Sequence, residues 1–190
     1  KKRQYDSREG SDFPLDERLV DALELIEDVL LAPPFAAVVR CRLRDRKPTL
    51  VWSDAMWEPR PDLPFGLGRI GFVVKAPRPD DGYDIYYAKS EVPQEFLELL
   101  FDLRQQKTFI HPLEMLGLVA PYLCPQLEAL WDDADVIHFG DNESANGVAI
   151  KGASRARDLS RLALILHARL ASSATRLWIE RVTSEGNIAD

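Results

Sequence analysis

Four acidic residues in this sequence occupy positions from which a carboxylate could bind a metal ion. Asp54 directly follows the apolar run Leu50 to Ser53, and Asp141 follows a second run, Val136 to Gly140. We predict that each carboxylate stands at the end of a strand, where a sheet holds a side chain rigidly while leaving it open to a ligand. Aspartate is also a common turn residue after a strand, and for either residue alone this explanation is favoured by roughly two to one.

The other two acids also have local explanations. Glu114 falls in the first turn of a predicted apolar helix that opens at Pro112, where an acid could simply stabilise the helix dipole. Asp190 closes the segment Gly186 to Asp190 and could be an acid or cap at a helix N-terminus. The combined order of strand aspartate, helix glutamate, strand aspartate and post-strand aspartate is much harder to attribute to four independent local effects.

The elements that must position these acids follow from the spacing of apolar residues. Five short runs bounded by turn-forming residues predict strands at Thr49 to Ser53, Ile70 to Lys75, Tyr83 to Ala88, Val136 to Phe139 and Leu177 to Val182. The first three read as an antiparallel meander. Helical spacing predicts one helix from Pro93 to about residue 106, one from Pro112 that Pro121 and Pro125 kink or end, and one at about Leu159 to Leu170. This order predicts a mixed α/β sheet covered by helices.

The N-terminal part of the chain has a different character. Apolar residues at i, i+3 and i+4 spacing predict an amphipathic helix of about residues 16 to 31, which ends before a Pro-Pro pair. We place a domain boundary near Pro48. Residues 1–48 are then a tether helix and connector, and residues 49–190 are the main domain.

Composition excludes several classes of protein. With 190 residues, 46% of them hydrophobic, the chain can bury a core without disulfides or a structural metal. Its two cysteines, Cys41 and Cys124, provide neither a disulfide framework nor a C-x-x-C metal motif. No apolar stretch approaches the ~20 residues of a membrane-spanning helix, and the first residues lack the apolar core of a signal peptide. We therefore expect an intracellular chain, cytoplasmic or nuclear, cut from a longer polypeptide.

Together, these motifs resemble the ribonuclease H domain of retroelement reverse transcriptases, especially the retrotransposon form with a short final loop. The matching segments are Ser53-Asp54-Ala55, Leu113-Glu114-Met115-Leu116, Asp141-Asn142 with the run to Lys151-Gly152-Ala153-Ser154-Arg155, and Trp178 to Asp190. The resemblance covers about residues 49 to 190, and the helix before it resembles the tether that follows a polymerase region in such polyproteins. Two features depart from the family: the interval between Asp54 and Glu114 is longer than usual, and the final loop has no histidine.

The resemblance implies a ribonuclease-H-like fold, in which a mixed five-stranded sheet of three antiparallel strands and then two further strands is flanked by helices. It also makes Asp54, Glu114, Asp141 and Asp190 the catalytic, metal-binding acids. Because magnesium prefers oxygen ligands, such a site suits two Mg²⁺ ions, with Mn²⁺ as a substitute. The implied activity is hydrolysis of the RNA strand of an RNA/DNA hybrid during reverse transcription. The implied protein partner is the polymerase region of the same polyprotein.

The net charge of −7 is unevenly distributed. Residues 51 to 150 carry a balance of −10, whereas residues 151 to 181 carry +5. An acidic lobe beside a basic one suits a metal-dependent enzyme that acts on a phosphate backbone, although most charge runs are solvated faces. Four residues of the basic segment could hold a nucleic-acid phosphate: Lys151, Ser154, Arg155 and Arg157.

Other interpretations remain open from the sequence. Asn142 and Asn187 could orient the neighbouring acids by hydrogen bonds, but turn formation explains both nearly as well. The same fold could also serve as a catalytically silent module that binds nucleic acid or protein, or as a DNA-cleaving member of the same superfamily. The presence of all four acids argues against the silent module.

Overall fold

The computed structural model describes residues 47–104 and 109–190. The amphipathic helix predicted at about residues 16 to 31 lies outside these ranges. That helix and the domain boundary near Pro48 therefore stay predictions.

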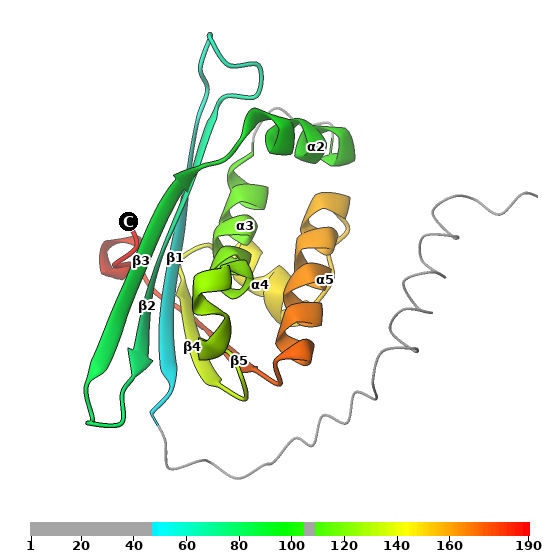
Figure 1. The fold of residues 1–190 in the computed structure, drawn as a ribbon. Coiled ribbons are helices and arrows are strands. Elements are labelled where there is room, and N and C mark those ends of the chain that lie inside the picture. The colour runs from blue at the N-terminus through cyan, green and yellow to red at the C-terminus, as the bar shows by residue number, and fades with distance from the viewer. Residues whose placement is uncertain (1–46, 105–108) are drawn as a thin grey trace, which may run out of the picture. The chain divides into compact units, whose positions relative to one another are not determined.

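Five strands form one mixed sheet in the order β3-β2-β1-β4-β5 (Figure 1). The strands are β1 (Thr49–Glu58), β2 (Leu67–Pro77), β3 (Tyr83–Glu91), β4 (Asp135–Gly140) and β5 (Arg176–Arg181). β1 pairs antiparallel with β2 and β2 with β3, whereas β4 pairs parallel with both β1 and β5. The prediction of three antiparallel strands followed by two further strands is confirmed.

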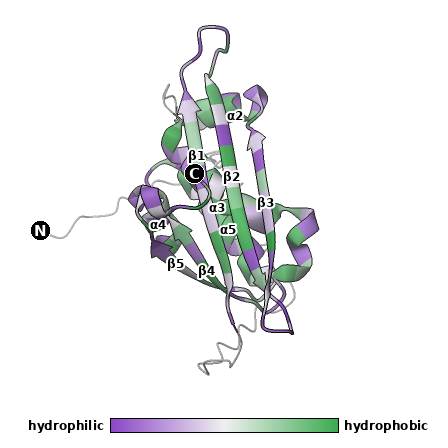
Figure 2. Ribbon diagram, turned by 90° about the vertical axis from the view of Figure 1, so that its left-hand side faces the viewer, coloured by the Kyte–Doolittle hydropathy of each residue, from purple (hydrophilic) through white to green (hydrophobic). Residues whose placement is uncertain are grey.

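Four helices and two short 3₁₀ turns complete the described part of the chain. They are α2 (Gln94–Arg104), α3 (Ile110–Leu123), η1 (Pro125–Leu130), α4 (Glu143–Lys151), α5 (Arg157–Ser172) and η2 (Ser184–Gly186). α3, α4 and α5 lie on one side of the sheet, and η2 lies on the other (Figure 1). Figure 2 views the sheet in front of these helices and shows hydrophobic and hydrophilic residues interleaved along the strands.

The main core fills the space between the sheet and the helices. Alternate residues of β1, namely Thr49, Val51 and Ser53, are buried there, as expected for a strand with one face against a core. The apolar stripe predicted for α5 is buried as well: Leu159, Leu162, Ala163, Leu166 and Leu170. Eight of the 14 residues of α3 are buried, so α3 is the central helix of this layer.

A buried polar network joins three of these elements. The imidazole of His138 on β4 is hydrogen-bonded through Nε2 to Ser53 Oγ on β1 at 2.8 Å and through Nδ1 to the hydroxyl of Tyr122 on α3 at 3.0 Å. Burial lowers the pKa of His138 to about 3, so the ring is neutral. Because each buried polar group has a partner, the network is stable only when β1, β4 and α3 keep one relative position.

Several predicted element boundaries differ from the structure, and two of them bear on the acidic residues. β1 does not end before Asp54 but continues to Glu58, because β2 pairs with it along its whole length. α3 begins at Ile110 rather than at Pro112 and has no acid in its first turn. Stabilisation of a helix dipole therefore no longer explains Glu114. Pro121 lies inside α3, which continues to Leu123.

The β1–β2 hairpin extends past Asp54 and packs against a second apolar cluster. The buried residues of this cluster are Val92, Leu97, Leu100, Phe109 and Leu113. The indole of Trp57 donates to the carbonyl of Phe65 at 3.0 Å, and the side-chain amide of Gln94 donates to the carbonyl of Gly66 at 2.8 Å. Gly66 adopts a φ of 76°, and a Cβ there would lie 2.7 Å from the carbonyl of Glu58. The proline-rich loop is thus held in one conformation next to α2.

Candidate active site

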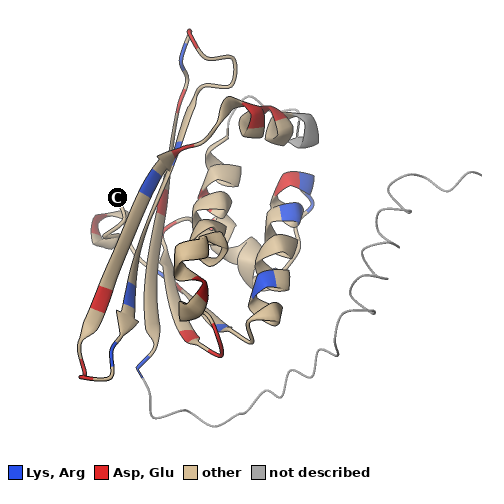
Figure 3. Ribbon diagram, viewed as in Figure 1, with Lys and Arg blue, Asp and Glu red and all other residues tan. Residues whose placement is uncertain are grey.

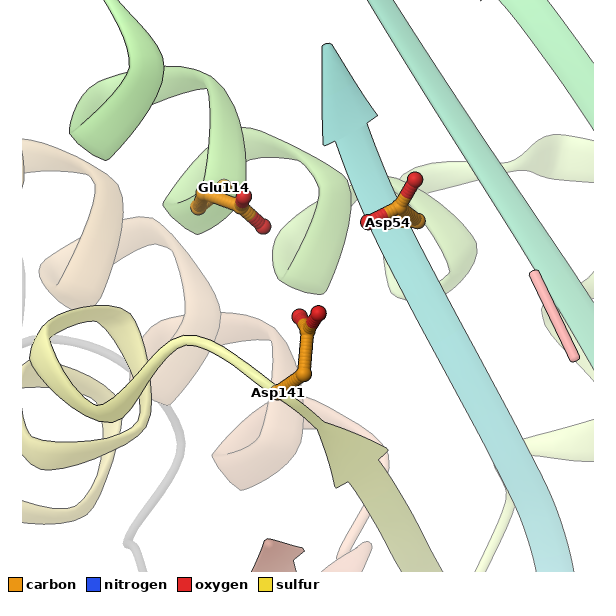
Figure 4. A group of neighbouring side chains, drawn as sticks. All are labelled: Asp54, Glu114 and Asp141. Atoms are coloured by element: carbon orange, nitrogen blue, oxygen red, sulfur yellow. The ribbon is translucent and has the colours of Figure 1, made fainter. Parts of the chain in front are cut away.

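Three of the four predicted acids come together in the structure. Asp54 comes from β1, Glu114 from α3 and Asp141 from the residue after β4 (Figure 4). One carboxylate oxygen from each residue takes part in a group whose members all lie within 4.8 Å of one another. All three side chains are half-buried. This spacing allows a single cation to contact all three carboxylates.

The strand pairing explains why these acids converge. The parallel pairing of β1 with β4 stops at Trp52 and Phe139, after which β1 follows β2 and β4 ends. Asp54 and Asp141 each stand two residues beyond that last pair. The two aspartates therefore flank a fork where the sheet opens, which is where side chains of an α/β sheet become available to a ligand.

Close packing of α3 on β1 brings in the third acid. A Cβ on Gly117 would lie 3.1 Å from the carbonyl oxygen of Asp54, so α3 approaches the strand closely at this residue. Glu114 stands three positions earlier on the same helix face. Its carboxylate is thereby directed at the fork.

Burial, and then neighbouring negative charge, disfavours the ionised forms of Glu114 and Asp54. Burial raises the pKa of Glu114 to about 8, and the charges of Asp141 and Asp54 add to this effect, whereas a hydrogen bond from the Asn142 side chain opposes it. Burial also raises the pKa of Asp54, and the charges of Asp141 and Asp190 contribute in the same direction. A bound divalent cation would reverse these effects, because it favours the ionised form of every neighbouring carboxylate.

One oxygen atom of the cluster has no hydrogen-bond partner, and a cation could supply one. Asp141 Oδ1 is buried and has no hydrogen-bond partner, whereas Asp141 Oδ2 accepts a hydrogen bond of 2.7 Å from the hydroxyl of Ser184. A buried carboxylate oxygen without a partner is unfavourable, and coordination to a cation would satisfy it. Since all the donors are carboxylate oxygens, the residues fit a hard ion such as Mg²⁺ better than a soft one.

The fourth predicted acid, Asp190, is not a member of this cluster. Its charge is close enough to raise the pKa of Asp54, and its backbone N–H donates to the carbonyl of Asn187 at 3.2 Å. The buried side chain of Asn187 in turn donates to the carbonyl of Ser53 at 2.9 Å. The turn that carries Asp190 is therefore tied to β1 beside Asp54. The role of Asp190 as a metal ligand stays a prediction.

Comparisons with known proteins identify the architecture. The sequence matches no family model and no curated protein. The structure is similar to that of ribonuclease H1 from the halophilic archaeon Halobacterium salinarum NRC-1, with 15% identity and a TM-score of 0.50 over 74% of this chain and 89% of that one. The chain has a ribonuclease-H-like fold. A second similar structure is the N-terminal ribonuclease H domain of a Mycobacterium tuberculosis protein, with 17% identity and a TM-score of 0.49 over 73% of this chain and 84% of that one.

Within this ribonuclease-H-like fold, Asn142 connects α4 to the acidic cluster. Its side-chain oxygen accepts from the N–H groups of Ser144 at 3.0 Å and Ala145 at 3.1 Å, which caps α4. The same side chain hydrogen-bonds to Glu114. Sequence reasoning missed α4, although Asn142 as a cap, Glu143 in the first turn and a glycine after the last turn together form a recognisable helix signature.

The predicted phosphate-binding residues lie where α4 leads into α5. Lys151 ends α4 and Arg157 begins α5, and both are exposed, as is Arg155 between them. Ser154 is half-buried, and its hydroxyl accepts from the N–H of Ala156 at 3.1 Å, so part of its hydrogen-bonding capacity serves the turn. α4 starts beside the acidic cluster and rises about 13 Å over its length. These cations are therefore separated from the cluster by roughly the length of α4. Figure 3 shows basic residues on α5 and acidic residues on α2.

The surface next to Asp54 is hollowed. A hollow of about 500 Å³ adjoins Asp54 and is lined by residues of β1, β2 and β3, including Arg69 and Lys89. Arg69 is paired with Glu91 at 2.9 Å.

Among the residues that the structure describes, no helix combines the length and the apolar character that crossing a membrane requires.

Proposed function

We propose that this chain is a metal-dependent endonuclease that hydrolyses the RNA strand of RNA/DNA hybrids. The observation that carries the proposal is the convergence of Asp54, Glu114 and Asp141 at the fork of a ribonuclease-H-like sheet. The unpartnered, buried Oδ1 of Asp141 supports a cation at this position. The choice of substrate rests on the sequence resemblance and on similarity to ribonuclease H1.

In this proposal, Asp54, Glu114 and Asp141 hold two Mg²⁺ ions, and Asp190 joins them from the turn beside β1. Bound there, the two ions would supply activation of the attacking water and stabilisation of the leaving 3′ oxygen of the phosphodiester. A carboxyl oxygen of Glu114 holds a proton at neutral pH in the metal-free protein, since its pKa is about 8, and releases it when a cation binds. Asn142 and Asn187 orient the cluster through hydrogen bonds to Glu114 and to the backbone of β1.

The substrate reaches the cluster across a surface of mixed charge. Because the hollow of about 500 Å³ adjoins Asp54, a phosphodiester in a long polymer can approach this carboxylate. The exposed cations Lys151, Arg155 and Arg157, together with Ser154 in the same turn, bind the backbone of the hybrid farther away. Such contacts position a duplex without reading its sequence.

The biological context that we propose is reverse transcription inside the cell, in the cytoplasm or the nucleus. The segment Trp178 to Asp190 supports it, because this is the part of the sequence that most specifically resembles retroelement ribonucleases H. The protein partner is then the polymerase region of the same polyprotein, to which residues 1–48 provide the connection.

One assay tests the activity directly. The chain is incubated with an RNA/DNA hybrid, duplex RNA and duplex DNA, each with and without Mg²⁺. We expect Mg²⁺-dependent cleavage of the hybrid alone, with a 5′ phosphate and a 3′ hydroxyl on the products. Asp54→Asn and Glu114→Gln should abolish cleavage, whereas Glu98→Gln, at an exposed acid on α2, should not. Cleavage that persists in both site variants refutes the site, and cleavage of duplex DNA instead assigns a different substrate.

A second function is favoured by one observation. Since Asp190 is not a member of the cluster, the chain could be a catalytically silent module of the same fold that binds nucleic acid or a protein. Calorimetric titration with Mg²⁺ separates the two functions. An endonuclease must bind the ion through these carboxylates, and Asp54→Asn must weaken that binding, whereas a silent module shows no such binding.

A further inference from the structure

A serine from a distant part of the chain contacts the acidic cluster. Ser184, at the start of η2, donates its hydroxyl to Asp141 Oδ2 over 2.7 Å. The other oxygen of this carboxylate, Oδ1, is buried and has no hydrogen-bond partner. The two oxygens of Asp141 therefore have different environments, and the serine determines which of them remains available.

The turn that contains Ser184 does not need this hydroxyl for its own structure. The N–H of Gly186 donates to the carbonyl of Thr183 at 2.9 Å, and the N–H of Asn187 donates to the carbonyl of Ser184 at 3.1 Å. These backbone bonds close the turn. The acceptor of the Ser184 side chain lies 43 positions earlier in the sequence, so the bond acts on the site rather than on the turn.

Both ends of the turn are fixed to strands that carry the acids. Before it, the N–H of Val182 donates to the carbonyl of Gly140 at 3.2 Å and so extends the pairing of β5 with β4. After it, the buried side chain of Asn187 donates to the carbonyl of Ser53 at 2.9 Å. The hydroxyl of Ser184 is consequently held at a defined place relative to both β4 and β1.

We infer that Ser184 is a positioning residue, which holds the Asp141 carboxylate so that Oδ1 faces the metal ion. This inference rests on the proposed function. The terminal torsion of an aspartate is broad and roughly two-fold, so without the serine the carboxylate can rotate and exchange its two oxygens. The hydrogen bond removes that freedom before the cation arrives. Partners of this kind commonly change metal affinity 10- to 100-fold.

The test is calorimetric titration of Mg²⁺ and of Mn²⁺ into the full chain and its variants. We expect Ser184→Ala to bind each ion roughly 10-fold more weakly and Ser184→Thr, which keeps a hydroxyl, to bind as the unaltered chain does. Ser172→Ala is the matched control, because it removes an exposed hydroxyl on α5 that donates only to a backbone carbonyl. Thermal melting in EDTA should be the same for all four proteins, which separates positioning from folding.

The outcomes distinguish this inference from the proposed function. Equal affinity in the unaltered chain and in Ser184→Ala overturns the role of Ser184 and leaves the metal site intact. A weakened affinity in Ser172→Ala also overturns it, since the effect is then not specific. If the unaltered chain binds neither ion, the proposed metal site is itself wrong and the role of Ser184 falls with it.

Discussion

Replacing Glu114 by glutamine should stabilise the metal-free protein at neutral pH. The pKa of Glu114 is raised to about 8 from an ordinary value of 4.5, first by burial and then by the charges of Asp141 and Asp54. The folded protein therefore binds a proton that the unfolded chain has already released. This ionisation penalty is absent below about pH 4.5, grows as the pH rises, and is constant above about pH 8. Glutamine has a similar shape and never ionises.

The size of the effect follows from the two pKa values. At pH 7 the unfolded carboxyl is ionised and the folded one is mostly protonated, which corresponds to roughly 3 kcal/mol in favour of unfolding. Solvent screening of the half-buried side chain reduces this to roughly 2 to 3 kcal/mol. Glu114→Gln should recover this amount in EDTA. For a domain of this size, the gain raises the melting temperature by roughly 5 to 10 °C.

Urea denaturation of both proteins at pH 4 and pH 7 measures the difference. We expect equal stability at pH 4 and a more stable Glu114→Gln at pH 7 in EDTA, whereas the exposed Glu98→Gln should match the unaltered chain at both values. Adding Mg²⁺ should reduce the difference, because the ion stabilises only the protein that binds it well. A variant that is no more stable than the unaltered chain at pH 7 in EDTA would contradict the reasoning.

Three further predictions concern the scaffold and the substrate surface. Below pH 6.5 the stability should fall by up to ~1.4 kcal/mol per pH unit, because the pKa of His138 is lowered to about 3 by burial and only the unfolded chain takes up the proton. Urea denaturation at several pH values should show that the stability of His138→Gln falls less per pH unit. An unchanged pH dependence of stability refutes this. Gly140→Ala should reduce the stability of the protein by about 1–3 kcal/mol and weaken Mg²⁺ binding. The added Cβ would clash with the side chain of Asn146, which donates to the Gly140 carbonyl. Melting and titration curves equal to those of the unaltered chain would contradict this prediction. Lys151→Ala with Arg155→Ala should weaken hybrid binding and flatten its salt dependence by roughly one unit of slope per charge, and unchanged affinity excludes these contacts.

Periodic patterns predicted most of the fold but not the boundaries near the site. The buried stripe of α5 has an unambiguous 3.6-residue spacing, so its position was predictable. Asp54 has a low strand propensity and suggested a strand end, but pairing with Gly71 on β2 continues the strand through it. α4 was missed because it is short and only weakly amphipathic. The pairing of Asp54 with Gly71 is a tertiary effect, which leaves no signal in the local sequence.

The site itself could be predicted only as a set of residues. That Asp54, Glu114 and Asp141 meet depends on the parallel pairing of β1 with β4, which the periodicity of the sequence does not show. The contact between Ser184 and Asp141 joins the first residue of the three-residue turn η2 to the residue that follows β4. No spacing rule in the sequence marks such a pair.

The fork between β1 and β4 gives the two sides of the proposed metal site unequal backbone restraint. Asp54 has strand on both sides of it and is paired with β2 before and after the fork, so its backbone is fixed. Asp141 stands where a strand has just ended, so its backbone has fewer restraints. The backbone at Asp54 is thus more restrained than the backbone at Asp141. In the proposed function, accommodation of ions of different radius, or of successive states of a substrate, would therefore fall to the Asp141 side. This is also the side that a hydroxyl from a separate turn holds in place.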